Sequence, residues 1–356
     1  RSMSDGIHLN LFTMNSVEHV SPGSWTHPAD RSAEYTDREY WTDVARTAER
    51  GGFAAVFFAD VRGIYDVYGG DRETAIEHAV QTPSNDPGYL VPAMAEVTDH
   101  LGFAITKSTS YTHPYQLARE FSTLDHVTDG RIAFNVVTSY LESAAANLGL
   151  DERMEHDERY DRAQEFMEVC YQLWEDSWDD DAVVRDRDSG TYTDPEKVHD
   201  IHFEGEYFDV PGPHGCEPSP QRTPVIYQAG SSDRGREFAA RNAEAVFVSQ
   251  PNEQAVREYV ADLRERAASH GRDPDSLEFF PGIVPVVGET EELAEAKYES
   301  YVDSIDVEGV LTLLSGFTDI DLSELDPDQK LEHVETQAMQ GVVNAFTTND
   351  DREWTG

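Results

Sequence analysis

Short apolar runs alternate with amphipathic stretches along the chain, and this alternation limits the possible folds more than any other feature. Seven runs have the length and composition of buried strands, and helical patterns lie between them. Such an order predicts parallel strands joined by crossover helices. The strands are predicted at residues 7–13, 54–60, 102–108, 132–139, 224–229, 245–249 and 278–287, and the helices at 37–50, 89–100, 115–127, 158–174, 233–242, 253–269 and 291–301.

Seven βα units in series favour a (β/α)8 TIM barrel over an open doubly wound sheet. The chain lacks the G-x-G-x-x-G turn that is typical of a dinucleotide-binding open sheet. No convincing eighth strand follows residue 301, so we expect the last βα unit to be missing or disguised. Residues 175–222 are rich in acids, prolines and glycines. They are predicted to form an insertion after the fourth βα unit, with a hairpin near residues 202–210.

No change in composition marks a second domain. Residues 3–356 are therefore expected to form a single barrel domain, with residues 302–356 as a helical segment that serves as a lid. Arg1 and Ser2 precede Met3 and are interpreted as a cloning remnant. The sequence contains no membrane-length apolar stretch and no signal peptide, and Cys170 and Cys216 have no disulfide or metal-binding spacing. A cytoplasmic location is predicted.

The acidic residues outnumber the basic ones by a margin that argues against two classes of partner. The 356 residues include 70 Asp and Glu against 27 Lys and Arg, which gives a net charge of −43. Nucleic acids and anionic membranes are therefore not expected to bind. The excess is typical of proteins adapted to a high-salt cytoplasm, where charge repulsion is screened over a short distance. The alternative is an acidic protein from an ordinary cytoplasm.

A glycine and two serines stand where a predicted strand meets a predicted helix. Gly230 allows a tight turn, while Ser231 and Ser232 offer hydroxyl and N–H groups at the helix start, where an anion is favoured. Taken alone, the pair would be an ordinary helix cap. In a barrel this turn lies at the active-site face, and the position favours a phosphate site.

Polar side chains at the ends of other elements are further candidates. His156 and Tyr160 share one face at a helix start, where they suit a phosphate monoester or merely begin an exposed first turn. Asn135 interrupts an apolar run, so its amide needs a partner, either a planar heterocycle or the backbone. Asp60 ends a strand, where a carboxylate belongs to a barrel site or only begins a turn.

Two other kinds of site receive little support. His199 and His202 are spaced closely enough to share a metal, but no third ligand follows at a fixed spacing, so no metal is predicted and a solvated surface pair is expected. The sequence has no G-x-S-x-G nucleophile motif and no P-loop.

Several stretches, in order along the chain, together resemble the bacterial-luciferase-like flavin-dependent monooxygenases. The resemblance is to the branch that contains nitrilotriacetate, EDTA, dibenzothiophene sulfone and dimethyl sulfide monooxygenases. The matching stretches are Val56-Phe-Phe-Ala-Asp60, Tyr65-Asp-Val-Tyr-Gly-Gly70, Asn85-Asp-Pro87, residues 131–139, His156-Asp-Glu-Arg-Tyr-Asp-Arg162, Leu173-Trp-Glu-Asp-Ser-Trp178 and Gln228-Ala-Gly-Ser-Ser232.

The resemblance implies a barrel that binds reduced FMN supplied by a separate NAD(P)H:flavin reductase. Through a flavin C4a-(hydro)peroxide, such an enzyme inserts one oxygen atom of O₂ into a small organosulfur or amine-containing compound. A homo-oligomer is also implied. By resemblance, the phosphate ligands are Tyr160 and Ser231, with Ser232 and Ser139 near them, and the other FMN contacts are Asp60, Thr106, Asn135 and His156. The substrate side of the ring, with catalytic roles, is assigned to His19, Tyr65 and Gln81.

Two other functions remain open from the sequence. The first is an FMN-binding protein without turnover, and the second is an F420-dependent relative of the same fold. FMN binding without an oxygenated product would indicate the first. Competition between F420 and FMN for the site would indicate the second.

Overall fold

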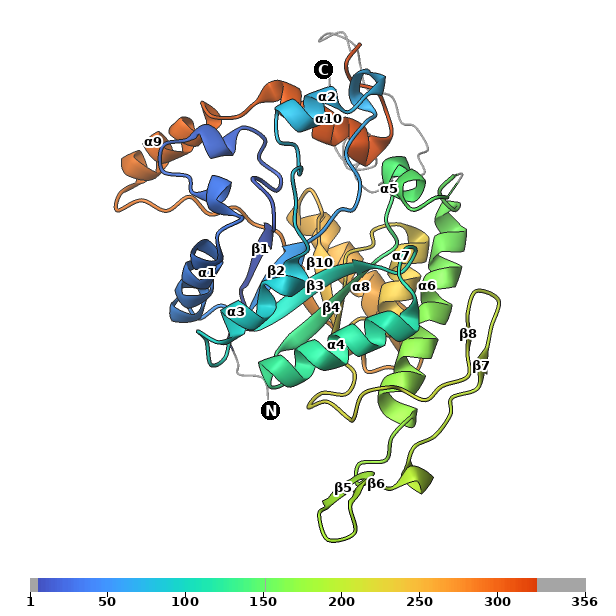
Figure 1. The fold of residues 1–356 in the computed structure, drawn as a ribbon. Coiled ribbons are helices and arrows are strands. Elements are labelled where there is room, and N and C mark those ends of the chain that lie inside the picture. Colours follow the sequence, from blue (N-terminus) through green and yellow to red (C-terminus); the bar gives the residue numbers. More distant parts are fainter. Residues whose placement is uncertain (1–5, 151, 325–356) are drawn as a thin grey trace.

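The protein is built around a parallel sheet of seven strands, seen in a computed structural model that describes residues 6–150 and 152–324 (Figure 1). Every pairing in this sheet is parallel. The predicted α/β class is confirmed, and the strands follow one another in sequence order around the sheet. They are β1 (Asn10–Met14), β2 (Ala55–Ala59), β3 (Gly102–Ser108), β4 (Ile132–Val137), β9 (Val225–Gln228), β10 (Ala245–Val248) and β11 (Glu278–Pro281).

The sheet is curled, so that side chains from strands far apart in the sheet order meet inside it. The ring centroids of Phe12 on β1 and Phe247 on β10 are 4.8 Å apart, although these strands are not neighbours in the sheet. Asn10 on β1 also donates a hydrogen bond to the Tyr227 hydroxyl on β9, over 3.1 Å. The described residues therefore form a half-barrel of seven strands, without an eighth strand in this sheet.

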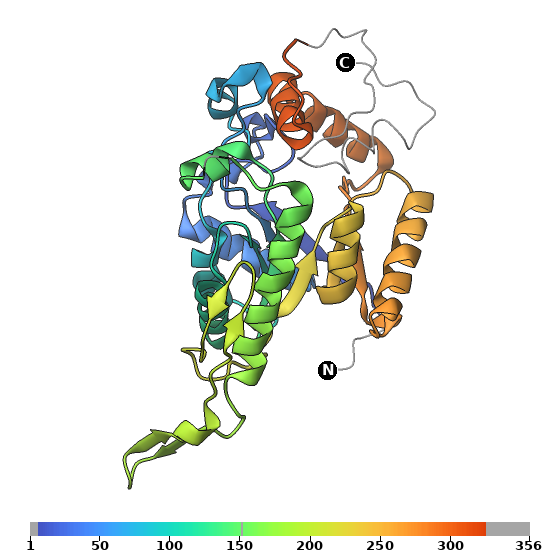
Figure 2. The ribbon, with the colours of Figure 1, turned by 90° about the vertical axis from the view of Figure 1, so that its right-hand side faces the viewer.

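Helices cover the outer, convex face of the curled sheet (Figures 1 and 2). In α4, Leu117 and Phe121 are fully buried, and the Phe121 ring lies 4.9 Å from that of Phe134 on β4. Burial of such side chains is the main stabilising contribution of these helices. The outer helices are α1 (Arg38–Arg50), α3 (Val91–Ala95), α4 (Pro114–Thr128), α6 (His156–Tyr171), α7 (Asp233–Asn242) and α8 (Glu253–Ser269). Helix α9 (Glu291–Val302) has no buried residue.

Two predicted elements are shorter than expected. The helix predicted over residues 89–100 is only α3, because the Glu49 carboxylate accepts the backbone N–H groups of residues 99–101 and draws the chain away from the helix. The strand predicted over residues 278–287 ends at Pro281. Neither Pro281 nor Pro285 can donate a backbone hydrogen bond, and Val284 between them is 90% exposed.

Residues 175–222 form two hairpins. The predicted hairpin is confirmed as β7 (Phe203–Glu204) paired with β8 (Asp209–Val210). A second hairpin, β5 (Val183–Asp186) with β6 (Thr191–Thr193), was not predicted, and it projects away from the body of the protein (Figures 1 and 2).

Three short helices lie beyond the carboxyl ends of the strands. They are α2 (Glu73–Glu77), α5 (Glu142–Asn147) and α10 (Val307–Thr318), and α10 packs beside α2 (Figure 1). Helix α10 belongs to the predicted lid, whose remaining part, residues 325–356, lies outside the described residues. Within residues 6–150 and 152–324, no helix is both long enough and apolar enough to cross a membrane.

Candidate active site

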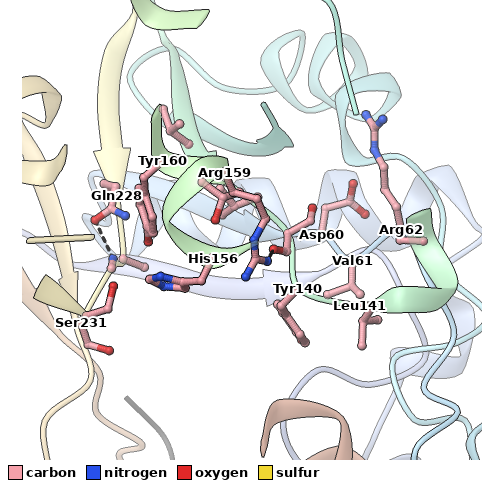
Figure 3. Close-up of a pocket in the computed structure, with 18 residues that line it drawn as sticks. Asp60, Val61, Arg62, Tyr140, Leu141, His156, Arg159, Tyr160, Gln228 and Ser231 are labelled. Carbon is pink, nitrogen blue, oxygen red and sulfur yellow. Dashed lines mark hydrogen bonds between the residues drawn. The ribbon is translucent and has the colours of Figure 1, made fainter. Parts of the chain in front are cut away.

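A pocket opens at the carboxyl ends of β2, β4 and β9, the place where a parallel barrel carries its active site (Figure 3). The start of α6 forms its remaining wall. The pocket brings together six of the predicted site residues, from four separate stretches of the chain. Its lining consists of Asp60, Val61, Arg62, Val136, Val137, Thr138, Ser139, Tyr140, Leu141, Ala144, His156, Arg159, Tyr160, Gln228, Ala229, Gly230, Ser231 and Ser232.

The turn between β9 and α7 forms one end of the pocket. Ser232 is the N-cap of α7, and its hydroxyl accepts the N–H of Gly235 over 3.1 Å. A Cβ added at Gly230 would lie 2.5 Å from Gln228 Nε2 and 2.7 Å from Gly235 Cα. Glycine is therefore required for this close approach. The cap interpretation of Ser232 is confirmed, and the anion site at the same residue stays a prediction.

Tyr160 and His156 face this turn from the start of α6 (Figure 3). The Tyr160 side chain is buried, so the alternative of an exposed first turn is wrong for this residue. Burial raises the pKa of its phenol, and hydrogen bonding with Ser232, Thr138 and Gln228 acts in the opposite direction. The phenol is thus protonated at neutral pH and can donate to an anion. His156 is half-buried and pairs with Asp157 over 2.8 Å.

Ser139 lies at the end of β4 in a left-handed conformation, with φ of 56°. Its hydroxyl donates to that of Ser108 over 2.7 Å, and its carbonyl oxygen accepts a hydrogen bond from the Arg159 guanidinium. Hydrogen bonds therefore hold both the hydroxyl and the carbonyl oxygen of Ser139, and they keep the chain in this left-handed turn beside the pocket.

Thr106 on β3 and Asn135 on β4 are buried neighbours in the sheet, and neither belongs to the pocket lining. The Asn135 amide donates to the Thr106 hydroxyl over 2.7 Å, and Thr106 donates to the carbonyl oxygen of Phe58 over 2.6 Å. The Asn135 Oδ1 atom is buried and has no hydrogen-bond partner. The alternative of a backbone partner therefore does not account for this atom, which remains able to accept from a ligand N–H.

Asp60 ends β2 and lines the pocket on the side away from the serines (Figure 3). Burial and the nearby Asp86 carboxylate raise its pKa to about 6, while Arg62 and Lys107 act in the opposite direction. Lys107 is buried and forms ion pairs with Asp86 at 2.7 Å and Glu120 at 2.9 Å. The Asp60 carboxyl group therefore changes charge near pH 6.

The three residues assigned to the substrate side come together, although they are not part of the pocket lining. Gln81 donates from Nε2 to the backbone oxygen of His19 over 2.6 Å, and the Tyr65 hydroxyl donates to Gln81 Oε1 over 3.0 Å. Burial lowers the pKa of His19 to about 4, so its imidazole is neutral at neutral pH. Any proton that His19 donates must therefore come from a neutral ring N–H.

Sequence reasoning missed five polar residues of the pocket: Arg62, Thr138, Tyr140, Arg159 and Gln228. Arg159 stands inside the stretch that drew attention to His156 and Tyr160, and its burial was the missing signal. Tyr140 directly follows the predicted strand that ends at Ser139. The two histidines considered for metal lie elsewhere, and His199 pairs with Asp179 over 3.1 Å. Among the residues that the structure describes, no group of three or more metal-ligating side chains occurs.

Comparison with known proteins gives matches over nearly the whole chain. The model of the luciferase-like monooxygenase family matches residues 20–354. The dimethyl-sulfide monooxygenase of Hyphomicrobium sulfonivorans is 49% identical over 354 residues, which are 99% of this chain and 74% of that protein. The long-chain alkane monooxygenase of Geobacillus thermodenitrificans strain NG80-2 is 54% identical over 322 residues, or 90% of this chain and 73% of that protein.

A solved structure agrees with these relatives. The crystal structure of a riboflavin lyase with modified FMN and riboflavin superimposes with a TM-score of 0.90 and 36% identity, covering 96% of this chain and 76% of that chain. The predicted resemblance to the dimethyl sulfide branch is confirmed by these matches.

Proposed function

Because the chain belongs to the luciferase-like monooxygenase family, we propose that it is an FMNH₂-dependent monooxygenase that inserts one oxygen atom of O₂ into a small organosulfur or amine-containing compound. The observation that supports this most is the pocket in which the turn of Gly230 to Ser232 meets the buried Tyr160 phenol, and Asn135, whose buried amide oxygen has no hydrogen-bond partner, directly precedes the lining residue Val136. The relatives are named monooxygenases, which favours turnover over simple flavin binding.

The residues present fit FMN. The Ser231 and Ser232 hydroxyls, the start of α7 and the Tyr160 phenol offer hydrogen-bond donors to a phosphate. A Cβ at Gly230 or Gly235 would fill the space where that turn closes on Tyr160. Farther in, Asn135 Oδ1 has an unused acceptor position that suits an N–H edge of a planar ring.

In this proposal the residues hold the cofactor and shape its surroundings. Tyr160 and Ser231 bind the phosphate, with Ser139, Ser232 and His156 beside them, while Asp60, Thr106 and Asn135 position the ring. Bound reduced FMN supplies the electrons that activate O₂ and the means of oxygen transfer. The side chains of His19, Tyr65 and Gln81 form the substrate side, and α10 limits the access of water there.

Further features of the complete protein are part of the same proposal. The curled sheet is the larger part of a (β/α)8 barrel, with residues 175–222 as its insertion. A separate NAD(P)H:flavin reductase supplies FMNH₂, and the enzyme acts as a homo-oligomer. The free thiols Cys170 and Cys216 are compatible with a reducing cytoplasm.

The proposal is tested by supplying FMNH₂ from an added flavin reductase and NADH under ¹⁸O₂, with dimethyl sulfide as substrate. We expect one ¹⁸O atom in the oxidised product and NADH consumption only when the reductase is present. Flavin binding without labelled product from any tested sulfide, amine or alkane would contradict a monooxygenase. Protein with Tyr160→Phe and Ser231→Ala together is the matched control, because the two changes remove only hydroxyl groups that the proposal assigns to the phosphate, and thermal unfolding checks that the fold is kept.

A long-chain alkane is a second candidate substrate, because the alkane monooxygenase is 54% identical to this chain. The same assay separates the two classes when hexadecane replaces dimethyl sulfide. Labelled alcohol from the alkane, without labelled product from the sulfide, would assign the chain to alkane oxidation.

A further inference from the structure

A chain of hydrogen bonds leads from a backbone carbonyl group to the edge of the pocket. Its first members are the backbone oxygen of His19, the Gln81 amide and the Tyr65 hydroxyl. Its last member is Tyr140, whose hydroxyl oxygen lies 2.6 Å from that of Tyr65. Tyr140 lines the pocket, whereas Tyr65 is fully buried.

The carbonyl group at the start of this chain fixes the direction of every hydrogen bond. A carbonyl oxygen only accepts, so Gln81 must direct its NH₂ group at His19 and its oxygen at Tyr65. The single hydroxyl proton of Tyr65 is then donated to Gln81 Oε1. The proton between the two phenols must belong to Tyr140, because each phenol has only one.

The two phenols keep their protons and their positions. Burial raises the pKa of both, so neither ionises near neutral pH. Gly316 of α10 lies directly against the Tyr65 ring, where a Cβ would overlap it. The Phe317 ring stands edge-on to both phenols, with centroids 6.1 Å from each. The orientation is therefore held by packing as well as by hydrogen bonds.

We propose that Tyr140 is a positioning residue whose hydroxyl oxygen accepts but does not donate, so that it selects an N–H or O–H group of the molecule bound beside it. This rests on the proposed function only in taking the pocket as the active site. The group selected is either the N–H that the cofactor ring gains on reduction or a group of the substrate. The chemistry is the same in both cases, and the two sources are separable by experiment.

The cofactor arm of the test compares oxidised FMN with anaerobically photoreduced FMN. If the donor is on the reduced ring, Tyr140→Phe should weaken binding of reduced FMN by about three- to tenfold, the loss of one ordinary hydrogen bond, and leave oxidised FMN unchanged. Tyr89→Phe is the matched control, since Tyr89 is 86% exposed. Thermal unfolding of each variant checks that the fold is kept.

The substrate arm uses two small molecules of the same shape, methanesulfonamide, which has an N–H donor, and dimethyl sulfone, which has only acceptors. Binding is measured by calorimetry with and without FMN. If the donor is on the substrate, the protein should prefer the sulfonamide, and Tyr140→Phe should remove that preference. Tyr65→Phe should also reduce it, because Tyr140 then regains a proton to donate.

The proposal is supported if Tyr140→Phe weakens the binding of reduced FMN alone, or if it removes the preference for the sulfonamide. Which of the two results is found identifies the donor. If Tyr140→Phe changes neither the difference in affinity between reduced and oxidised FMN nor that between methanesulfonamide and dimethyl sulfone, the proposal is wrong. Absence of FMN binding by the unaltered protein would instead contradict the proposed function, and the measurement without FMN would still decide the role of Tyr140.

Discussion

The Asp60 carboxyl group is charged at neutral pH, although its buried position disfavours the charged form. Its pKa of about 6 exceeds the ordinary 3.8, chiefly because the carboxyl group is buried. Below about pH 4 the group is protonated in the folded and the unfolded chain, so its raised pKa does not lower the stability of the fold. As pH rises toward 6, only the unfolded chain ionises freely, and stability falls. Such a cost is typical of a group kept for binding or catalysis.

Asp60→Asn is therefore expected to remove a pH-dependent loss of stability. The difference in unfolding free energy between the variant and the unaltered protein should rise by about 1–2 kcal/mol, in favour of the variant, from pH 4 to pH 7.5. This figure includes a discount for the partial exposure of Asp60. Urea unfolding at the two pH values measures this. Asp188→Asn, on the exposed β5–β6 hairpin, should show no such gain. A difference for Asp60→Asn that stays constant with pH would show that the carboxyl group is not perturbed.

Sequence reasoning finds site residues that stand at the junction of a strand and a helix. Ser231 and Tyr160 were found in this way, because their places at an element end are visible in the local pattern. Tyr140 and Arg159 were not, because their roles depend on which distant loops pack against them. The bond between Tyr140 and Tyr65, for example, joins residues 75 positions apart.

At the scale of elements, α10 is held against the site by a glycine. Its Gly316 faces the Tyr65 ring, and its N-cap Asp306 pairs with His78, which follows α2. The helix thereby joins the loops that carry the substrate-side residues, and its position depends on the space left by the missing Cβ.

Gly316→Ala should destabilise the protein although alanine has the higher helix propensity. We expect a net loss of about 1–2 kcal/mol, since overpacking costs more than the roughly 1 kcal/mol that propensity returns. Turnover should fall further, while FMN binding is retained. Val307→Ala on the same helix is the control, because Val307 is 68% exposed. Unfolding and flavin titrations measure both effects, and unchanged stability in Gly316→Ala would show that α10 moves freely.

The elements themselves were predictable where burial and periodicity coincide. Strands such as β4 and helices such as α8 follow their predicted patterns closely. The β5–β6 hairpin was missed because it is exposed on both faces and so has no alternation of apolar and polar residues. The end of β11 was placed too late because apolar residues continue past Pro281 without being buried.

At the scale of the whole molecule, charge is the dominant feature. A net charge of −43 requires strong repulsion among surface carboxylates at low ionic strength. Some of the basic residues form ion pairs, as in the group formed by Arg266 with Asp233, Glu237 and Asp262. These pairs offset only part of the repulsion, since there are 27 basic residues for 70 acidic ones.

The midpoint of thermal unfolding should therefore rise when KCl increases from 0.1 M to 2 M. Screening shortens the reach of each charge from about 10 Å to roughly 3 Å or less over this range. Chloride is suitable because it has less of the general stabilising effect of sulfate or phosphate. A midpoint that stays constant or falls would show that the protein is merely acidic and not adapted to high salt.

The central claim is that the turn at Gly230 to Ser232 and the Tyr160 phenol bind the phosphate of FMN. Calorimetric titration with FMN and with riboflavin, which lacks the phosphate, tests it most directly. We expect FMN to bind at least about tenfold more tightly, and Tyr160→Phe to reduce that ratio by about three- to tenfold while leaving riboflavin binding unchanged. Equal affinity for the two flavins, or a ratio that Tyr160→Phe does not alter, would contradict the account.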